Sequence, residues 1–107
     1  NRLSDGAALC DRVNRSGCKI MADFFHMSIE EDTIPGALRE YATAYVRHIH
    51  LADSNRATPG HGHTDFAAAF AVLEEIGWDG YMALECSTRG DAREDIKRAA
   101  AFLREQA

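Results

Sequence analysis

Apolar residues recur along this chain at two spacings that alternate from one segment to the next. Apolar positions three or four residues apart predict helices over about residues 4–17, 28–45, 65–76 and 91–106. Short, mostly apolar runs between them predict strands over residues 18–22, 46–51 and 81–84. Four helices alternating with three strands predict an α/β fold whose strands are parallel and joined by right-handed crossovers.

Small polar residues mark the expected starts of the helices. Ser4 is expected to cap the first helix, and residues 28–31 have the capping-box pattern S-x-x-E before the second. Either Thr64 or Asp65 is expected to cap the third helix, and residues 91–94 give another possible box before the last. Apolar spacing along that last helix predicts that Ile96, Ala99, Ala100 and Leu103 face inward. The segment 53–64 contains proline, two glycines, asparagine and serine, so it is predicted to be a loop.

Composition places the chain among ordinary globular proteins. Its 107 residues are 46% hydrophobic and 27% charged, which predicts one modest domain over residues 1–107 rather than a disordered chain. The net charge of −5 argues against nonspecific binding to nucleic acid or to an anionic membrane. No run approaches the roughly 18–20 apolar residues of a membrane span, so no membrane partner is expected.

The three cysteines, Cys10, Cys18 and Cys86, do not form a metal-binding or disulfide pattern in the sequence. They are odd in number, and none belongs to a C-x-x-C motif. Together with the absence of a signal-like start, this predicts reduced thiols in a cytoplasmic protein. The chain opens on Asn1 rather than on methionine, which is compatible with a start that has been cut.

Each of the three predicted strands ends next to a residue that can bind a metal ion. These residues are Asp23, His50 and Glu85. The carboxyl ends of parallel strands lie at one edge of a sheet, where such folds bind their ligands. The alternative is that the three residues are polar strand ends that cap helices or face solvent, and their positions alone do not decide between the two.

Local spacing around these strand ends favours a shared site. His48 and His50 lie two positions apart and therefore point to the same face of a strand. Asp23 and His26, three apart, can converge from a strand and the loop after it. Carboxylates and imidazoles without a thiolate suit a divalent cation, with Mn²⁺ or Mg²⁺ favoured by the carboxylates and Co²⁺ or Zn²⁺ as alternatives.

Three segments of the chain are similar to a known family. They read MADFFHMSIEE, HIHLADSNRATPGHGHTDF and EIGWDGYMALE. They resemble the D-tagatose 3-epimerase-like members of the xylose isomerase-like barrel superfamily, over nearly the whole chain. The resemblance implies the C-terminal half of a (β/α)₈ barrel, and it implies the function of a sugar isomerase or epimerase.

The resemblance also implies roles for individual residues. It implies that Asp23, His50 and Glu85 bind the metal, that Glu85 also exchanges a proton with substrate, and that His26 and Arg56 contact substrate. The implied reaction moves a proton next to a carbonyl through an enediolate, with metal assistance. Two further residues are expected to lie behind this set. His48 is expected to be a packing or orienting residue, and Asp53 is expected to orient Arg56 or its loop.

The chain departs from the family in length. A (β/α)₈ barrel takes about 250 residues, so this chain matches only the last three βα units and the helix before them. The resemblance implies a further metal-binding and acid–base glutamate upstream of Asn1. A three-stranded sheet also leaves edges and one face bare, which predicts a homodimer or higher homo-oligomer.

Two alternatives to an isomerase or epimerase follow from these departures. One is a non-catalytic metal- or sugar-binding remnant, or an assembly module of the same fold. The other is the endonuclease IV branch of the superfamily, which the acidic balance and the lack of extra metal ligands disfavour.

Overall fold

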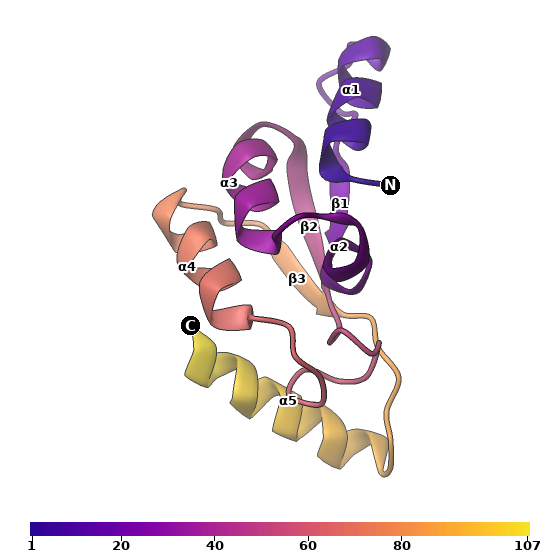
Figure 1. Cartoon of the computed structure of the whole chain (residues 1–107), viewed down its shortest axis with the longest axis vertical. Helices are drawn as coiled ribbons and strands as arrows, with labels where there is room; N and C mark the ends of the chain where they lie inside the picture. Colours follow the sequence, from indigo (N-terminus) through magenta and orange to yellow (C-terminus); the bar gives the residue numbers. More distant parts are fainter.

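The computed structural model describes residues 1–107 as an α/β fold with one open parallel sheet (Figure 1). The elements follow one another as α1 (Leu3–Val13), β1 (Ile20–Asp23), α2 (Phe24–Glu30), α3 (Ile34–Tyr45), β2 (Val46–Leu51), α4 (Phe66–Glu75), β3 (Tyr81–Leu84) and α5 (Ala92–Gln106). The strands lie in the order β1-β2-β3, so each crossover returns to the neighbouring position, as in part of a TIM barrel. None of the helices has both the length and the apolar character needed to cross a membrane.

The register of the sheet separates its two faces. Ala22 pairs with Ile49, and both are almost completely buried on the face that the helices pack against, which we call the covered face. Met21 pairs with His48, and His48 with Tyr81, on the opposite face. Met21 is 48% exposed and Tyr81 is 82% exposed, so we call this side the open face.

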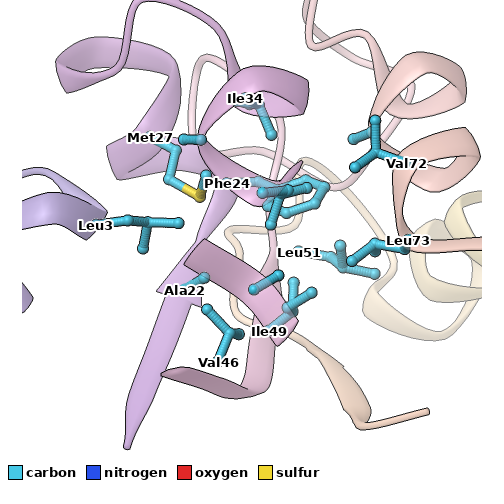
Figure 2. Packing of buried hydrophobic residues seen from close by; sticks show 14 of the residues in the cluster. Leu3, Ala22, Phe24, Met27, Ile34, Val46, Ile49, Leu51, Val72 and Leu73 are labelled. Atoms are coloured by element: carbon cyan, nitrogen blue, oxygen red, sulfur yellow. The ribbon is translucent and has the colours of Figure 1, made fainter. Parts of the chain in front are cut away.

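The hydrophobic core lies between the covered face and the helices (Figure 2). Phe24, at the start of α2, occupies its centre and packs against Phe66 of α4, with ring centroids 6.1 Å apart. Val46, Ile49 and Leu51 supply the strand side of the same cluster. Burial of each such side chain stabilises the fold by about 1.5–3 kcal/mol, so the core holds the strand ends in place.

Strands β2 and β3 begin and end where the sequence predicted, whereas the number of helices differs. The sequence predicted four helices, and the structure has five because α2 follows β1 directly. The capping-box prediction for residues 28–31 is wrong, since Ser28 lies inside α2 and its hydroxyl donates to the Phe25 carbonyl. Thr33 caps α3 instead, by accepting from the Gly36 N–H.

The start of α1 also differs from the prediction at Ser4. The helix begins at Leu3, and the Leu3 N–H donates to the Glu31 carboxylate at 2.6 Å. Asp5 accepts from the Arg2 N–H at 2.8 Å and satisfies a second free donor. The cap therefore comes partly from a residue 28 positions away, which a local sequence pattern does not contain.

The caps of the last two helices agree with the sequence. Asp65 accepts from the Ala68 N–H at 2.9 Å, and Asp91 accepts from the Glu94 N–H at 3.0 Å. Both are ordinary N-cap contacts.

The inward face of α5 agrees with the prediction at Ala99 and Leu103 but differs from it at Ile96. Ile96 was expected to face inward but is 47% exposed, while the neighbouring Asp95 is only 1% exposed. The Asp95 carboxylate accepts from the N–H groups of Arg89 and Gly90, at 2.6 and 3.1 Å. These bonds tie the loop after β3 to the helix, and they turn Asp95 rather than Ile96 toward the protein.

Candidate metal centre

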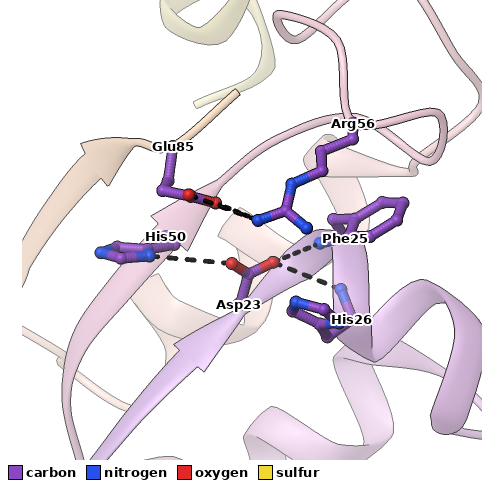
Figure 3. A network of polar contacts seen from close by, with 6 residues as sticks. All are labelled: Asp23, Phe25, His26, His50, Arg56 and Glu85. Atoms are coloured by element: carbon purple, nitrogen blue, oxygen red, sulfur yellow. Dashed lines mark hydrogen bonds and ion pairs between the residues drawn. The ribbon is translucent and has the colours of Figure 1, made fainter. Parts of the chain in front are cut away.

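The ends of the three strands meet at one edge of the sheet, and they bring Asp23, His50 and Glu85 together (Figure 3). One ligand atom from each of these residues lies within 4.8 Å of the other two. Asp23 pairs directly with His50 in the register, and Glu85 follows β3 with its N–H donated to the Leu51 carbonyl at 3.2 Å. The convergence expected from parallel strand ends is therefore present in the structure.

The donor set fits a divalent cation of hard or intermediate character. Two carboxylates and one imidazole supply oxygen and nitrogen atoms, and no thiolate lies among them. Burial decreases from Asp23, which is 9% exposed, through His50 to the exposed Glu85, so the cluster is closed behind and open in front. These are the features of a site that a ligand reaches from solvent.

The two carboxylate oxygens of Asp23 have different partners. Oδ1 accepts from the N–H groups of Phe25 and His26, at 2.9 and 3.2 Å, and so caps α2. Oδ2 faces His50, with 3.7 Å to its Nδ1 atom. Asp23 therefore fixes the helix with one oxygen and leaves the other for the cluster.

Arg56 lies beside Glu85 at the open side of the cluster. Its Nη2 atom is 3.0 Å from Glu85 Oε2, and its guanidinium carbon lies 5.2 Å from the centre of the Phe25 ring. The backbone of Arg56 has a positive φ of 61°, an uncommon conformation for a residue other than glycine. Its carbonyl accepts from the Ser87 N–H at 2.8 Å, which ties the loop after β2 to the loop after β3.

Asp53 organises the loop that carries Arg56. This side chain is 1% exposed, and its carboxylate accepts from the N–H groups of Ser54, Gly60 and Thr64, at 2.8, 2.8 and 3.0 Å. A side chain at Gly62 would place its Cβ in collision with Asp53 Oδ1, so only glycine fits there. Burial by itself raises the pKa of Asp53, but the N–H donors of Thr64, Ser54, Gly62 and Gly60 outweigh it and hold the pKa below its ordinary value.

The structure brings the other predicted residues to the same edge at different depths. His48 lies beneath His50 on the open face, with ring centroids 5.1 Å apart in an edge-to-face arrangement. His26 is exposed at the start of α2, with its ring 5.1 Å from that of Phe25. The Asp53 carboxylate points into its own loop and acts on Arg56 only through the backbone, since the Arg56 N–H donates to the Asp53 carbonyl at 2.8 Å.

Sequence reasoning did not identify Phe25 as a neighbour of Arg56. The contact brings together residues 31 positions apart, and no local spacing indicates it. One signal in the sequence could have indicated the contact. Phe25 follows closely after the strand-end residue Asp23, on the side to which the loop that carries Arg56 returns.

Comparison with known proteins identifies the family to which this fold belongs. A family model described as xylose isomerase-like TIM barrel matches residues 1–106. The chain belongs to the xylose isomerase-like TIM barrel family. Its fold class as part of such a barrel is thereby confirmed.

Relatives of the chain include sugar epimerases. The chain is 36% identical to the D-psicose 3-epimerase of Ruminiclostridium cellulolyticum over 85 residues, covering 79% of this chain and 29% of that protein. It is 33% identical over 105 residues to the 3-dehydro-D-guloside 4-epimerase of Escherichia coli, covering 97% of this chain and 40% of that protein. The chain thus spans about 30–40% of the length of the curated relatives that it matches.

Solved structures of the family superpose closely on the chain. The apo 3-keto-D-glucoside 4-epimerase from E. coli matches with a TM-score of 0.92 and 33% identity, over 98% of this chain and 40% of that one. A D-psicose 3-epimerase from Clostridium cellulolyticum, solved with D-tagatose, matches with a TM-score of 0.81 and 28% identity, over 98% of this chain and 43% of that one.

Proposed function

We propose that this chain is the part of a sugar isomerase or epimerase that holds a divalent cation and supplies one of its acid–base groups. The observation that carries the proposal is the convergence of Asp23, His50 and Glu85 from three strand ends, with ligand atoms within 4.8 Å of one another. Membership in a family with sugar epimerases as relatives supports it.

Asp23 and His50 are the proposed holders of the cation, together with Glu85. Mn²⁺ or Mg²⁺ suits the two carboxylates best, and Co²⁺ or Zn²⁺ is compatible with the imidazole. When bound at such a site, a divalent cation polarises a substrate carbonyl and makes the neighbouring C–H bond more acidic.

Glu85 is the proposed proton-transfer residue. It is the most exposed member of the cluster, so a substrate carbon can approach its carboxylate from solvent. Arg56, 3.0 Å away, carries a fixed positive charge that can hold substrate oxygens as negative charge develops on them. His26, exposed on α2, is proposed to contact the substrate from the opposite side.

A calorimetric titration with Mn²⁺ tests the cation site. We expect the wild type to bind Mn²⁺, and the double variant Asp23→Ala/Glu85→Ala to bind it more weakly by at least about a hundredfold. Glu74→Ala/Asp79→Ala is the matched control, because it removes two exposed carboxylates that lie outside the cluster. Equal affinities for the wild type and the Asp23/Glu85 variant would contradict the proposal.

Turnover separates this function from its alternative. The resemblance to the family implies a second acid–base glutamate on a strand that these 107 residues do not include, so turnover is measured on the chain together with the segment that supplies this glutamate. If that assembly binds Mn²⁺ but converts no ketohexose, the supported function is a non-catalytic metal- or sugar-binding unit of the same fold.

We also propose that a second copy of the chain covers the open face. Met21 and Tyr81 expose 48% and 82% of their surface there, which leaves apolar area for a partner to bury. A two-fold dimer is the simplest arrangement. Light scattering at micromolar concentration should give the mass of at least two chains, and the mass of one chain would overturn the dimer.

A further inference from the structure

Two of the three cysteine thiols lie next to each other at the end of the sheet opposite the Asp23–His50–Glu85 cluster. Cys10 is buried near the end of α1, and Cys18 lies just before β1. Their sulfur atoms are 3.7 Å apart, although the residues are eight positions apart in the sequence. Cys86 lies directly after Glu85, at the other end of the sheet.

The sulfur atoms are close enough for a bond to form with a small movement. A disulfide needs about 2.0 Å between the sulfurs, so they must approach by about 1.7 Å. Residues 11–17 between them are all exposed, and a side chain at Gly17 would meet nothing within 4 Å. Residues 11–13 are the exposed last residues of α1, and residues 14–17 form a turn on the surface, so Cys18 can move toward Cys10 without disturbing packed neighbours.

The two thiols differ in their access to solvent. They share an open hollow of about 560 Å³, which Arg15 and Lys19 also line. Cys18 is partly exposed, so an oxidant meets it first. Burial, followed by the contact with Cys18, raises the pKa of the Cys10 thiol, which suits Cys10 to act second.

We propose that Cys10 and Cys18 form a reversible disulfide that fixes the end of α1 to the residues preceding β1. Hydrogen peroxide serves as the oxidant. The Cys18 thiolate attacks one peroxide oxygen and the O–O bond breaks; the departing hydroxide takes up a proton to become water, which leaves a sulfenic acid on Cys18. The Cys10 sulfur then attacks the Cys18 sulfur, the S–O bond breaks, and the leaving hydroxide takes the Cys10 proton as a second water.

The balance is two thiols and one peroxide giving one disulfide and two waters, with the sulfurs oxidised and the peroxide oxygens reduced. A small dithiol such as dithiothreitol reverses the reaction by thiol–disulfide exchange. The disulfide would close a short loop between α1 and β1. In the unfolded chain it would limit the conformational freedom of residues 10–18. This inference does not rest on the proposed enzymatic function.

Peptide mapping of the full chain after mild peroxide treatment tests the disulfide. Trypsin cuts after Arg12 and Arg15, so it places the two cysteines on separate peptides, residues 3–12 and 16–19. We expect these peptides to appear joined, with an intact mass lower by two hydrogens and with Cys86 alone still alkylated. Dithiothreitol should separate them again.

Three variants make the test decisive. Cys86→Ser should form the same joined peptides, whereas Cys10→Ser and Cys18→Ser should not. Oxidation should raise the melting temperature of the wild type and of Cys86→Ser but not that of Cys18→Ser. The Cys18 side chain is only partly buried, so we expect the Cys18→Ser variant to fold. Oxidised wild type that carries sulfinic acids or intermolecular links in place of the joined peptides would overturn the proposal.

Discussion

The covered and open faces of the sheet are built from the same three strands, yet they differ in what their residues do. On the covered face, Ile49 is completely buried and packs in one cluster with residues from α2, α3 and α4. On the open face, His48 and His50 alternate with those core positions, and His50 belongs to the cluster at the strand ends. The covered face thus supplies stability, and the open face carries the polar residues of the candidate site.

This division is informative because the strands are short. β1 and β3 have four residues each, so each contributes only two residues to a face. A strand of this length holds its final residue in position only if the covered side is tightly packed. We infer that core substitutions on the covered face displace the cluster indirectly, whereas substitutions on the open face act on it without unfolding the chain.

The largest expected effect comes from truncating one residue on each face. Ile49→Ala should lower the free energy of unfolding by about 2–5 kcal/mol, because it leaves a cavity among buried side chains. Tyr81→Ala, at a position 82% exposed in the single chain, should change the free energy of unfolding of the monomer by less than about 0.5 kcal/mol. Urea denaturation of both variants, at a protein concentration where light scattering gives the mass of one chain, measures the difference. A large loss for Tyr81→Ala at that concentration would contradict the division of roles between the two faces.

An intermediate effect on the free energy of unfolding is expected at Asp53, in the loop after β2. Asp53→Asn should cost about 1–3 kcal/mol, since an amide cannot satisfy all the N–H donors that the carboxylate accepts. Asp65→Asn makes the same chemical change at a helix cap, where asparagine serves equally well, and should be nearly neutral. Chemical denaturation of the pair isolates the role of the loop, and equal losses would contradict it.

The smallest expected effect is a pH dependence that follows from the lowered pKa of Asp53. Its stabilisation is fully present above the ordinary value of 3.8 and is lost as the pH falls through the lower pKa of the folded state. The difference in unfolding free energy between wild type and Asp53→Asn should therefore stay constant from neutral pH to mildly acidic pH. It should narrow below 3.8, and a difference that widens there would refute the assignment.

Much of the fold could be predicted from the sequence because it depends on local patterns. Strands β2 and β3 follow from apolar runs bounded by turn residues, and Asp65 and Asp91 mark helix starts through contacts three residues away. The meeting of the three strand-end residues follows from a general rule for parallel sheets. Whether Asp23, His50 and Glu85 bind a metal stays a prediction.

The parts that the sequence did not predict depend on contacts between distant residues. Glu31 was expected to complete a capping box, but its carboxylate accepts from the Leu3 N–H at the start of another helix. Ile96 was expected to face inward, but Asp95 is buried in its place and accepts from the N–H groups of Arg89 and Gly90. The positive φ of Arg56 depends on a loop folded around Asp53, and no spacing in the sequence contains that arrangement.

Asp23 makes two different contacts with one carboxylate, which limits the residues that can replace it. Its Oδ1 atom caps α2 while Oδ2 faces His50. Asparagine would preserve the helix start but lose the charge, and glutamate would keep the charge but move it one methylene farther from the backbone N–H groups. No helix begins directly after Glu85, so a mutational scan scored by folding stability should find far fewer acceptable residues at position 23 than at position 85.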